Sequence, residues 1–225
     1  MGNLFKKTIF SDEQTAQSLA GTHPLGSAIV ASPKKINVGA PFQGAPPKAV
    51  PTDLLDAHNQ ARGTAGLKPL RENRRLAELA HDWGVYLKNK ENCMIRHPLE
   101  TQQEKERYIP GNIGQNLYVG HGYPENPTNP KAVVSAWYDE CRDYTPPKGD
   151  VPHNFKEVGH FTQLMWKDAS QVGCAKVDCP RKMRTPNGSE VDALGSVVVC
   201  NYDKGNVGGE FPTQVVWTKC PINFT

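Results

Sequence analysis

Six cysteines constrain this chain more than any other feature of its sequence. All of them lie in the last two thirds of the 225 residues, at Cys93, Cys141, Cys174, Cys179, Cys200 and Cys220. No two of them form a CxxC pair, so a zinc site of the finger type is not expected. Disulfide bonds are the better interpretation, and they imply an oxidising compartment. The alternative is six reduced cysteines that serve as small apolar residues.

The N-terminal part of the chain predicts an extension rather than a folded domain. No sustained hydrophobic period runs through residues 1–49. The segment from Pro33 to Pro51 is rich in proline and glycine, which is typical of a flexible linker. We therefore expect residues 1–49 to form a flexible or disordered extension and residues 50–225 to form one folded domain.

The N-terminus itself gives conflicting information on location. It lacks the continuous apolar stretch of a signal peptide, and no apolar run is long enough to span a membrane. The start Met1-Gly2-Asn3 resembles a myristoylation signal, although Lys6 stands where Ser or Thr is preferred. Two locations remain: the extracellular space or secretory pathway, which the cysteines favour, and an intracellular membrane surface contacted through acylated Gly2. An unmodified terminus is the remaining alternative.

Hydrophobic periodicity predicts helices first and strands afterwards. The helical patterns begin at three candidate caps: one runs from Thr52 until Gly63 and Gly66 end it, and the others run over Asn73–Leu87 and Asn129–Cys141. The strand signals are Leu117–Val119, Val172–Val177, Val197–Tyr202 and Val215–Thr218. This order favours an α+β layered fold over repeating βαβ units.

Six short motifs in a fixed order carry a resemblance to a known family. They are His58-Asn59-Gln60-Ala61-Arg62, Gly114-Gln115-Asn116-Leu117, Trp137-Tyr138-Asp139-Glu140, Gly159-His160-Phe161-Thr162-Gln163-Leu164-Met165-Trp166, Gly173-Cys174 with Cys179, and Cys200-Asn201-Tyr202-Asp203 with Gly205-Asn206. Residues 51–210 therefore resemble the CAP superfamily of cysteine-rich secretory, antigen 5 and pathogenesis-related 1 (PR-1) proteins. The cysteine spacing is closest to the plant PR-1-like branch. The last motif departs from the family pattern, which usually has a proline and one more residue before its glycine.

The resemblance implies a fold and two disulfides. The fold is a three-layer α/β/α sandwich with a small, mostly antiparallel sheet. The disulfides are Cys93–Cys179 and Cys174–Cys200. The two other cysteines, Cys141 and Cys220, match no common family pair. A bond between them would tie the C-terminal segment to the third helix, but the sequence leaves this pairing open.

The resemblance also implies a central polar cleft formed by His97, Gln115, Glu140 and His160. Imidazole and carboxylate groups suit Zn²⁺ or another divalent metal. Relatives carry a glutamate where this chain has Gln115, and a neutral amide is a poorer ligand, so we expect weak metal binding. Hydrogen bonds that stabilise the cleft are the alternative role, with Glu140 accepting from one of the histidines.

Other polar and aromatic residues have structural interpretations. We expect His58 to make a buried hydrogen bond and Arg62 to form an ion pair near it. We expect His121 to lie in a solvated loop and Trp137 to belong to the core.

The sequence favours a binding protein over an enzyme. It contains no Gly-x-Ser-x-Gly elbow, bonded cysteines are not nucleophiles, and His97, Glu140 and His160 leave no evident base for a hydrolase. The resemblance implies a small apolar ligand (a sterol or fatty acid) or a protein partner, with the loop 120–130 as a lid. A net charge of +3 is too balanced for nucleic acid. The alternatives are a metal-dependent hydrolase or protease in the same cleft, and a structural protein docked through its N-terminal linker and C-terminal tail.

Overall fold

The structure is a computed structural model that describes residues 52–122, 128–148, 151–216 and 220. The expected extension 1–49, with the candidate lipidation site Gly2, lies outside the described residues, as does the middle of the expected lid.

Across the described parts of the chain, no helix combines the length and the apolar character needed to cross a membrane.

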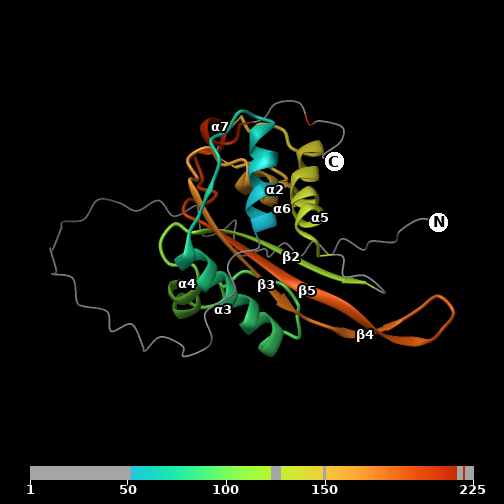
Figure 1. Cartoon of the computed structure of the whole chain (residues 1–225). Helices are drawn as coiled ribbons and strands as arrows, with labels where there is room; N and C mark the ends of the chain where they lie inside the picture. The colour runs from blue at the N-terminus through green and yellow to red at the C-terminus, as the bar shows by residue number, and fades with distance from the viewer. Residues whose placement is uncertain (1–51, 123–127, 149–150, 217–219, 221–225) are drawn as a thin grey trace. The chain divides into compact units, whose positions relative to one another are not determined.

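Most helices come before most strands along the chain (Figure 1). In chain order the elements are α2 (Thr52–Gly63), β1 (Arg71–Glu72), α3 (Arg74–Lys90), α4 (Gln102–Tyr108), β2 (Gly114–Gly122), α5 (Pro130–Tyr138), the 3₁₀ helix η1 (Asp139–Arg142), α6 (Phe155–Leu164), β3 (Gln171–Asp178), β4 (Arg181–Arg184), β5 (Glu190–Tyr202) and α7 (Phe211–Gln214).

The sheet forms the middle of three layers. Its strand order is β1-β3-β5-β2, and β4 also pairs with β5. All pairs are antiparallel except the short β1–β3 pair. In Figure 1, α3 and α4 lie on one side of the sheet, and α2, α5 and α6 lie on the other. This is the predicted α/β/α sandwich.

The central strand β5 is covered on both faces. Val198 and Tyr202 belong to the apolar cluster that includes α2, α5 and α6, whereas Val197 and Val199 belong to the cluster that includes α3. Successive side chains of a strand point to opposite faces, so each layer takes every second residue. This explains why residues 197–200 of β5 are a continuous apolar run.

Asparagine side chains cap the N-termini of two of the three predicted helices. Asn73 Oδ1 accepts from the Leu76 N–H at 3.1 Å, at the start of α3. At the start of α5, Asn129 Oδ1 accepts from the Ala132 N–H at 2.9 Å, with proline in the first turn. Both predicted caps are therefore confirmed. The third predicted cap, Thr52, was wrong, because Thr52 is the first residue of α2.

Strands β2, β3 and β5 are longer than the sequence predicted, and α6 was not predicted. Strand β2 continues to Gly122 because its whole length pairs with β5. His121 therefore lies on β2 and is half-buried, so its prediction as a solvated loop residue was wrong. It faces Gly195 in the register, and a Cβ there would come within 2.3 Å of the imidazole. Of the expected strand 215–218, Val215 forms an isolated bridge and residues 217–219 lie outside the described residues.

The six cysteines form three disulfides. They are Cys93–Cys179, Cys174–Cys200 and Cys141–Cys220. The first ties the segment after α3 to the end of β3, the second joins direct cross-strand partners of β3 and β5, and the third ties η1 to the C-terminal segment. Removing one native disulfide typically costs about 2–5 kcal/mol.

Candidate functional site

His160 and Glu140 form a hydrogen-bonded pair at the junction of α6 and η1. The His160 Nδ1 atom lies 2.8 Å from Glu140 Oε1. The other carboxylate oxygen accepts the main-chain N–H groups of His160 at 3.0 Å and Phe161 at 3.2 Å. Glu140 is buried, whereas the His160 side chain is 23% exposed. The carboxylate therefore holds one ring nitrogen, and the lone pair of the neutral ring is on Nε2.

His97 is held by an amide instead of a carboxylate. Its Nδ1 atom lies 2.9 Å from Gln115 Oε1. Gln115 Nε2 donates to Asn201 Oδ1 at 3.0 Å, and Asn201 Nδ2 donates to the Leu76 carbonyl at 3.3 Å. A carbonyl only accepts, so this relay fixes both amide orientations and turns Gln115 Oε1 toward the ring. His97 Nδ1 must then carry the proton.

The two pairs meet the sheet at consecutive positions of its edge strand β2. Gln115 is directly opposite Asn201 in the register, and both side chains face α3. The next residue, Asn116, faces the other layer, where its Nδ2 donates to the His160 carbonyl at 3.0 Å and to Tyr202 Oη at 3.3 Å. The four predicted side chains thus form two hydrogen-bonded pairs, and the neighbouring residues Gln115 and Asn116 connect both pairs to the same end of β2.

The four side chains do not offer a preformed three-ligand metal site. Within the described residues, His97, Glu140 and His160 are not a group whose ligand atoms all lie within 4.8 Å of one another. The group that meets this criterion in the described chain is His58, Cys174 and Cys200. Its two sulfur atoms are bonded to each other, so they are not thiolate ligands.

An arginine that the sequence analysis missed supports the segment that carries His97. Arg96 makes 2.9 Å ion pairs with Glu91 and Glu104. Its guanidinium lies over the rings of Trp83, 5.0 Å from the centroid, and Tyr86, 5.5 Å away. The hydrogen bond to Glu104 is the main cause that raises the pKa of Arg96. These contacts fix the orientation of the planar guanidinium group.

Arg96 is also bonded to the main chain at this point. Its Nη1 atom donates to the His97 carbonyl at 3.2 Å. Its own carbonyl accepts from Trp83 Nε1 at 3.0 Å. The main chain entering His97 is therefore fixed on two sides. Arg96 lies outside the motifs used for recognition, and only the folded chain brings its partners from α3 and α4 together.

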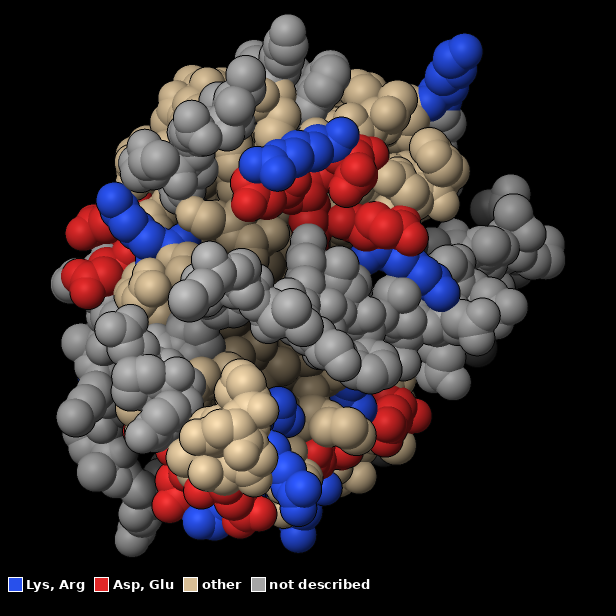
Figure 2. Space-filling model, turned by 90° about the vertical axis from the view of Figure 1, so that its right-hand side faces the viewer, with Lys and Arg blue, Asp and Glu red and all other residues tan. Residues whose placement is uncertain are grey.

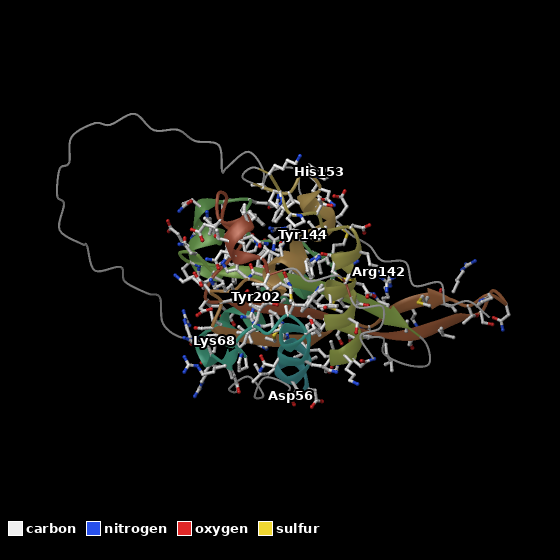
Figure 3. All side chains as sticks on the ribbon, turned by 90° about the horizontal axis from the view of Figure 1, so that it is seen from above. Asp56, Lys68, Arg142, Tyr144, His153 and Tyr202 are labelled. Atoms are coloured by element: carbon white, nitrogen blue, oxygen red, sulfur yellow. A yellow bond between two sulfur atoms is a disulfide. The ribbon has the colours of Figure 1, made fainter. Side chains whose placement is uncertain are left out.

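His58 belongs to a separate buried network. Its Nδ1 atom lies 2.6 Å from the Leu54 carbonyl, and its Nε2 atom lies 2.8 Å from Tyr202 Oη. Burial lowers the pKa of His58 to about 4 and raises the pKa of Tyr202. Tyr202 lies among the interior side chains in Figure 3, whereas Asp56 and Lys68 lie at the rim. The predicted buried hydrogen bond of His58 is confirmed.

The expected ion pair of Arg62 is wrong. Arg62 is fully buried and, within the described residues, it bonds to main-chain oxygens instead of a carboxylate. The acceptors, at 2.9–3.1 Å, are the carbonyls of Lys68, Leu164, Trp166 and Ala169. Burial lowers the pKa of Arg62 to about 10. The arginine thus ties α2 to the segment after α6.

Comparison with known proteins agrees with this arrangement of motifs on the fold. Residues 55–202, well over half of the chain, match the family described as "CAP: Cysteine-rich secretory protein family". The chain belongs to the CAP family. Pathogenesis-related protein 1A of Nicotiana tabacum is 34% identical over 161 residues, which cover 71% of this chain and 79% of the relative. Pathogenesis-related protein 1 of Arabidopsis thaliana is 31% identical over 164 residues, covering 72% and 81%.

Relatives outside plants match a similar length of this CAP protein. Venom allergen 5 of Vespula pensylvanica is 27% identical over 176 residues, which cover 70% of this chain and 76% of the relative. The plant matches are the more similar ones and confirm the predicted PR-1-like branch. Membership of a secretory family and three disulfides together indicate an extracellular type of protein.

Proposed function

We propose that this CAP protein is an extracellular binding protein whose cleft holds a divalent metal weakly through His97 and His160. One observation carries the proposal: each ring donates from Nδ1 to an acceptor oxygen, Gln115 Oε1 in one case and Glu140 Oε1 in the other. This is the arrangement that orients a metal-binding imidazole, because it leaves coordination to Nε2. The metal would then be held by Nε2 atoms, and Glu140 and Gln115 would act through the rings.

The same contacts are the reason to expect low affinity. Glu140 is already engaged by three N–H donors, so coordination through its oxygens would sacrifice buried hydrogen bonds. Gln115 carries no charge and already uses its amide for His97 and Asn201. Zinc prefers four ligands in structural sites and three in open ones, so two imidazoles plus solvent favour reversible binding.

A binding role fits the described chain better than hydrolysis. Among the described residues, no hydrogen bond joins a serine hydroxyl to an imidazole, and all six cysteines are in disulfides. Glu140 is turned toward main-chain N–H groups instead of a position where it could activate water. A metal-dependent hydrolase or protease would need a base that these contacts do not supply.

For the partner we propose a protein surface in preference to a sterol or fatty acid. An open hollow of about 350 Å³ between α2 and the start of α5 combines charged and amide side chains with apolar surface. The lining residues are Asp53, Asp56, Ala57, Gln60, Asn129, Pro130 and Lys131. Acidic and basic groups side by side suit a polar contact, whereas lipid sites are mostly apolar. On the face in Figure 2, basic and acidic side chains are interspersed, which supports the expectation of no nucleic-acid partner.

Zinc titration by calorimetry tests the proposal. We expect wild-type protein to bind one Zn²⁺ with a dissociation constant weaker than about 1 μM. His97→Ala and His160→Ala should each abolish the binding, whereas His153→Ala, at an exposed position, should leave it unchanged. Wild-type protein that binds no zinc, or binding that survives both cleft substitutions, rules the proposed site out. Chelator-sensitive hydrolysis of a peptide or ester library would favour the enzyme.

The location needs a separate measurement. We propose an extracellular protein, with peripheral membrane attachment through acylated Gly2 as the alternative. Mass spectrometry of the mature N-terminus distinguishes them, because export predicts cleavage and attachment predicts an acyl group on Gly2.

A further inference from the structure

The β4–β5 hairpin carries a sequence pattern that neither the cleft nor the core uses. Its turn contains Asn187-Gly188-Ser189. Asn, any residue except proline, then Ser or Thr is the acceptor pattern for N-linked glycans. A second match, Asn223-Phe224-Thr225, lies outside the described residues. Asn126-Pro127-Thr128 does not qualify, because proline stands in the middle.

The geometry of the turn leaves the Asn187 side-chain nitrogen available for a glycan. Its Oδ1 atom accepts the Ser189 N–H at 3.1 Å and also the Thr185 hydroxyl. The turn is closed by the Thr185 N–H, which donates to the Ser189 carbonyl at 2.9 Å, and by Gly188 with a φ of +87°. The amide oxygen is thus engaged as an acceptor, while no hydrogen bond within the described residues uses Nδ2. The nitrogen that would bond to a sugar is therefore left accessible.

The surroundings leave room for a glycan. Asn187, Gly188 and Ser189 are all exposed. In Figure 1 the hairpin extends from the sheet away from the helices. Its arms are held by main-chain pairing and by a 2.6 Å ion pair between Lys182 and Asp192, not by packing of the turn. A branched sugar on Asn187 would displace no core side chain.

We propose that Asn187 is a site of N-linked glycosylation. The donor class is an oligosaccharide bound through its anomeric carbon to a polyisoprenyl diphosphate. The Asn187 Nδ2 atom forms the new bond to that carbon and loses one proton to a base, and the carbon–oxygen bond breaks with its electron pair passing to the diphosphate. The site rests on the proposed extracellular location, because this chemistry occurs on chains that enter the secretory pathway.

A glycan here has a physical consequence for the edge of the sheet. Within the described residues β4 pairs with β5 alone, so its other edge presents unpaired N–H and C=O groups. Such an edge can pair with another chain and lead to aggregation. The basic side chains of β4 already oppose this, and a glycan at the adjoining turn would add a bulky hydrated cover.

Mobility after enzymatic deglycosylation tests the acceptor. The full chain, carried into the secretory pathway of insect cells by a cleavable signal, is compared with and without a peptide-N-glycanase. In the background Asn223→Gln we expect one mobility step. Asn187→Gln and Ser189→Ala should each remove it, and Ser189→Thr should retain it.

Each outcome has a separate meaning. Protein secreted with all cysteines bonded but with unmodified Asn187 overturns the glycosylation site. If the insect-cell protein is modified but the protein purified from its own source is not, the proposed location is overturned instead. Neither result affects the zinc titration, which reports on a different part of the molecule.

Discussion

Trp137 separates two histidines that have opposite surroundings. The ring of His58 meets it edge-on, with centroids 5.9 Å apart, and the ring of His160 lies nearly parallel to it, 6.2 Å away. His58 is fully buried, and both of its nitrogens have partners. His160 is partly exposed, and the hydrogen bonds of the described chain engage only its Nδ1 atom. The same residue type is thus fully buried and bonded on one side, and partly exposed with one bonded ring nitrogen on the other.

A single side chain connects these two regions. Asn116 Nδ2 donates both to Tyr202 Oη, the partner of His58, and to the His160 carbonyl. The buried network therefore fixes the main chain of α6 at His160. The difference between the rings lies in how many nitrogens the fold already uses, and this makes the comparison testable by substitution.

The largest effect should separate the two histidines by stability. His58→Ala removes two buried hydrogen bonds and leaves a cavity, so we expect unfolding to become easier by about 4 kcal/mol. His160→Ala should cost roughly 2 kcal/mol, because Glu140 loses a charge-assisted hydrogen bond but keeps two main-chain donors. Urea denaturation of both variants measures the difference. Equal losses would show that the proposed division between structural and accessible histidine is wrong.

A slightly smaller effect should appear in the pH dependence. The unfolded chain protonates His58 near its ordinary pKa of 6.5, but burial lowers the folded pKa to about 4. As the pH falls from 6.5 to 4, the unfolded state binds a proton at His58 that the folded state does not bind. The free energy of unfolding therefore decreases toward acid pH. About 2.5 pKa units correspond to roughly 3 kcal/mol lost between pH 6.5 and 4.

Denaturant titrations across this pH range, with His58→Gln as the comparison, isolate the contribution. The variant should be less stable at neutral pH but should lose less stability on acidification. Parallel pH profiles for the two proteins would contradict the assignment.

The contrast between the histidines was partly accessible from sequence. The motifs identified the family, and the caps Asn73 and Asn129 predicted where two helices start, because capping depends on local chemistry. Helix α4 was missed although Thr101 and Glu104 have the spacing of a capping signature, and Thr101 Oγ1 does accept the Glu104 N–H. Helix α6 was missed because the glycine and threonine of its motif weaken the helical signal, although Val158, Phe161 and Met165 have helical spacing.

The partners in the cleft could not be predicted in the same way. That Gln115 reaches Asn201 depends on the register between β2 and β5, which are distant in sequence. That Arg62 binds main-chain oxygens instead of a carboxylate depends on where the chain passes after α6. Local patterns carry no information on such non-local contacts, so these partners were not predictable, whereas the hydrogen bonds of His58 and Glu140 were expected from the motifs.

A smaller effect should come from restoring a charge beside His97. Gln115→Glu places a carboxylate where the amide now accepts from Nδ1, which should strengthen the ring as a metal ligand. We expect zinc affinity to rise by about tenfold, or roughly 1.4 kcal/mol. The control Gln103→Glu adds the same charge at an exposed position of α4. Calorimetry that shows the same gain in both variants would mean that net charge, and not the cleft, controls the binding.

The smallest effect should reach His97 through Arg96. Arg96→Lys keeps the charge but loses the planar group that bonds two carboxylates and stacks on Trp83 and Tyr86. We expect a stability loss of about 1 kcal/mol and zinc affinity lowered by a few-fold, because the main chain at His97 is less firmly held. The ¹⁵N shifts of the imidazole should also show a less uniform Nδ1–H tautomer, which a loss of stability alone would not produce. The matched control is Arg107→Lys, which likewise removes a guanidinium stacked on an aromatic ring, here that of Tyr108. Arg96→Lys could lower stability while zinc affinity and the His97 tautomer stay as in the wild type. Arg96 would then support the fold and not the cleft. The boundary between the structural and the accessible region would pass between residues 96 and 97.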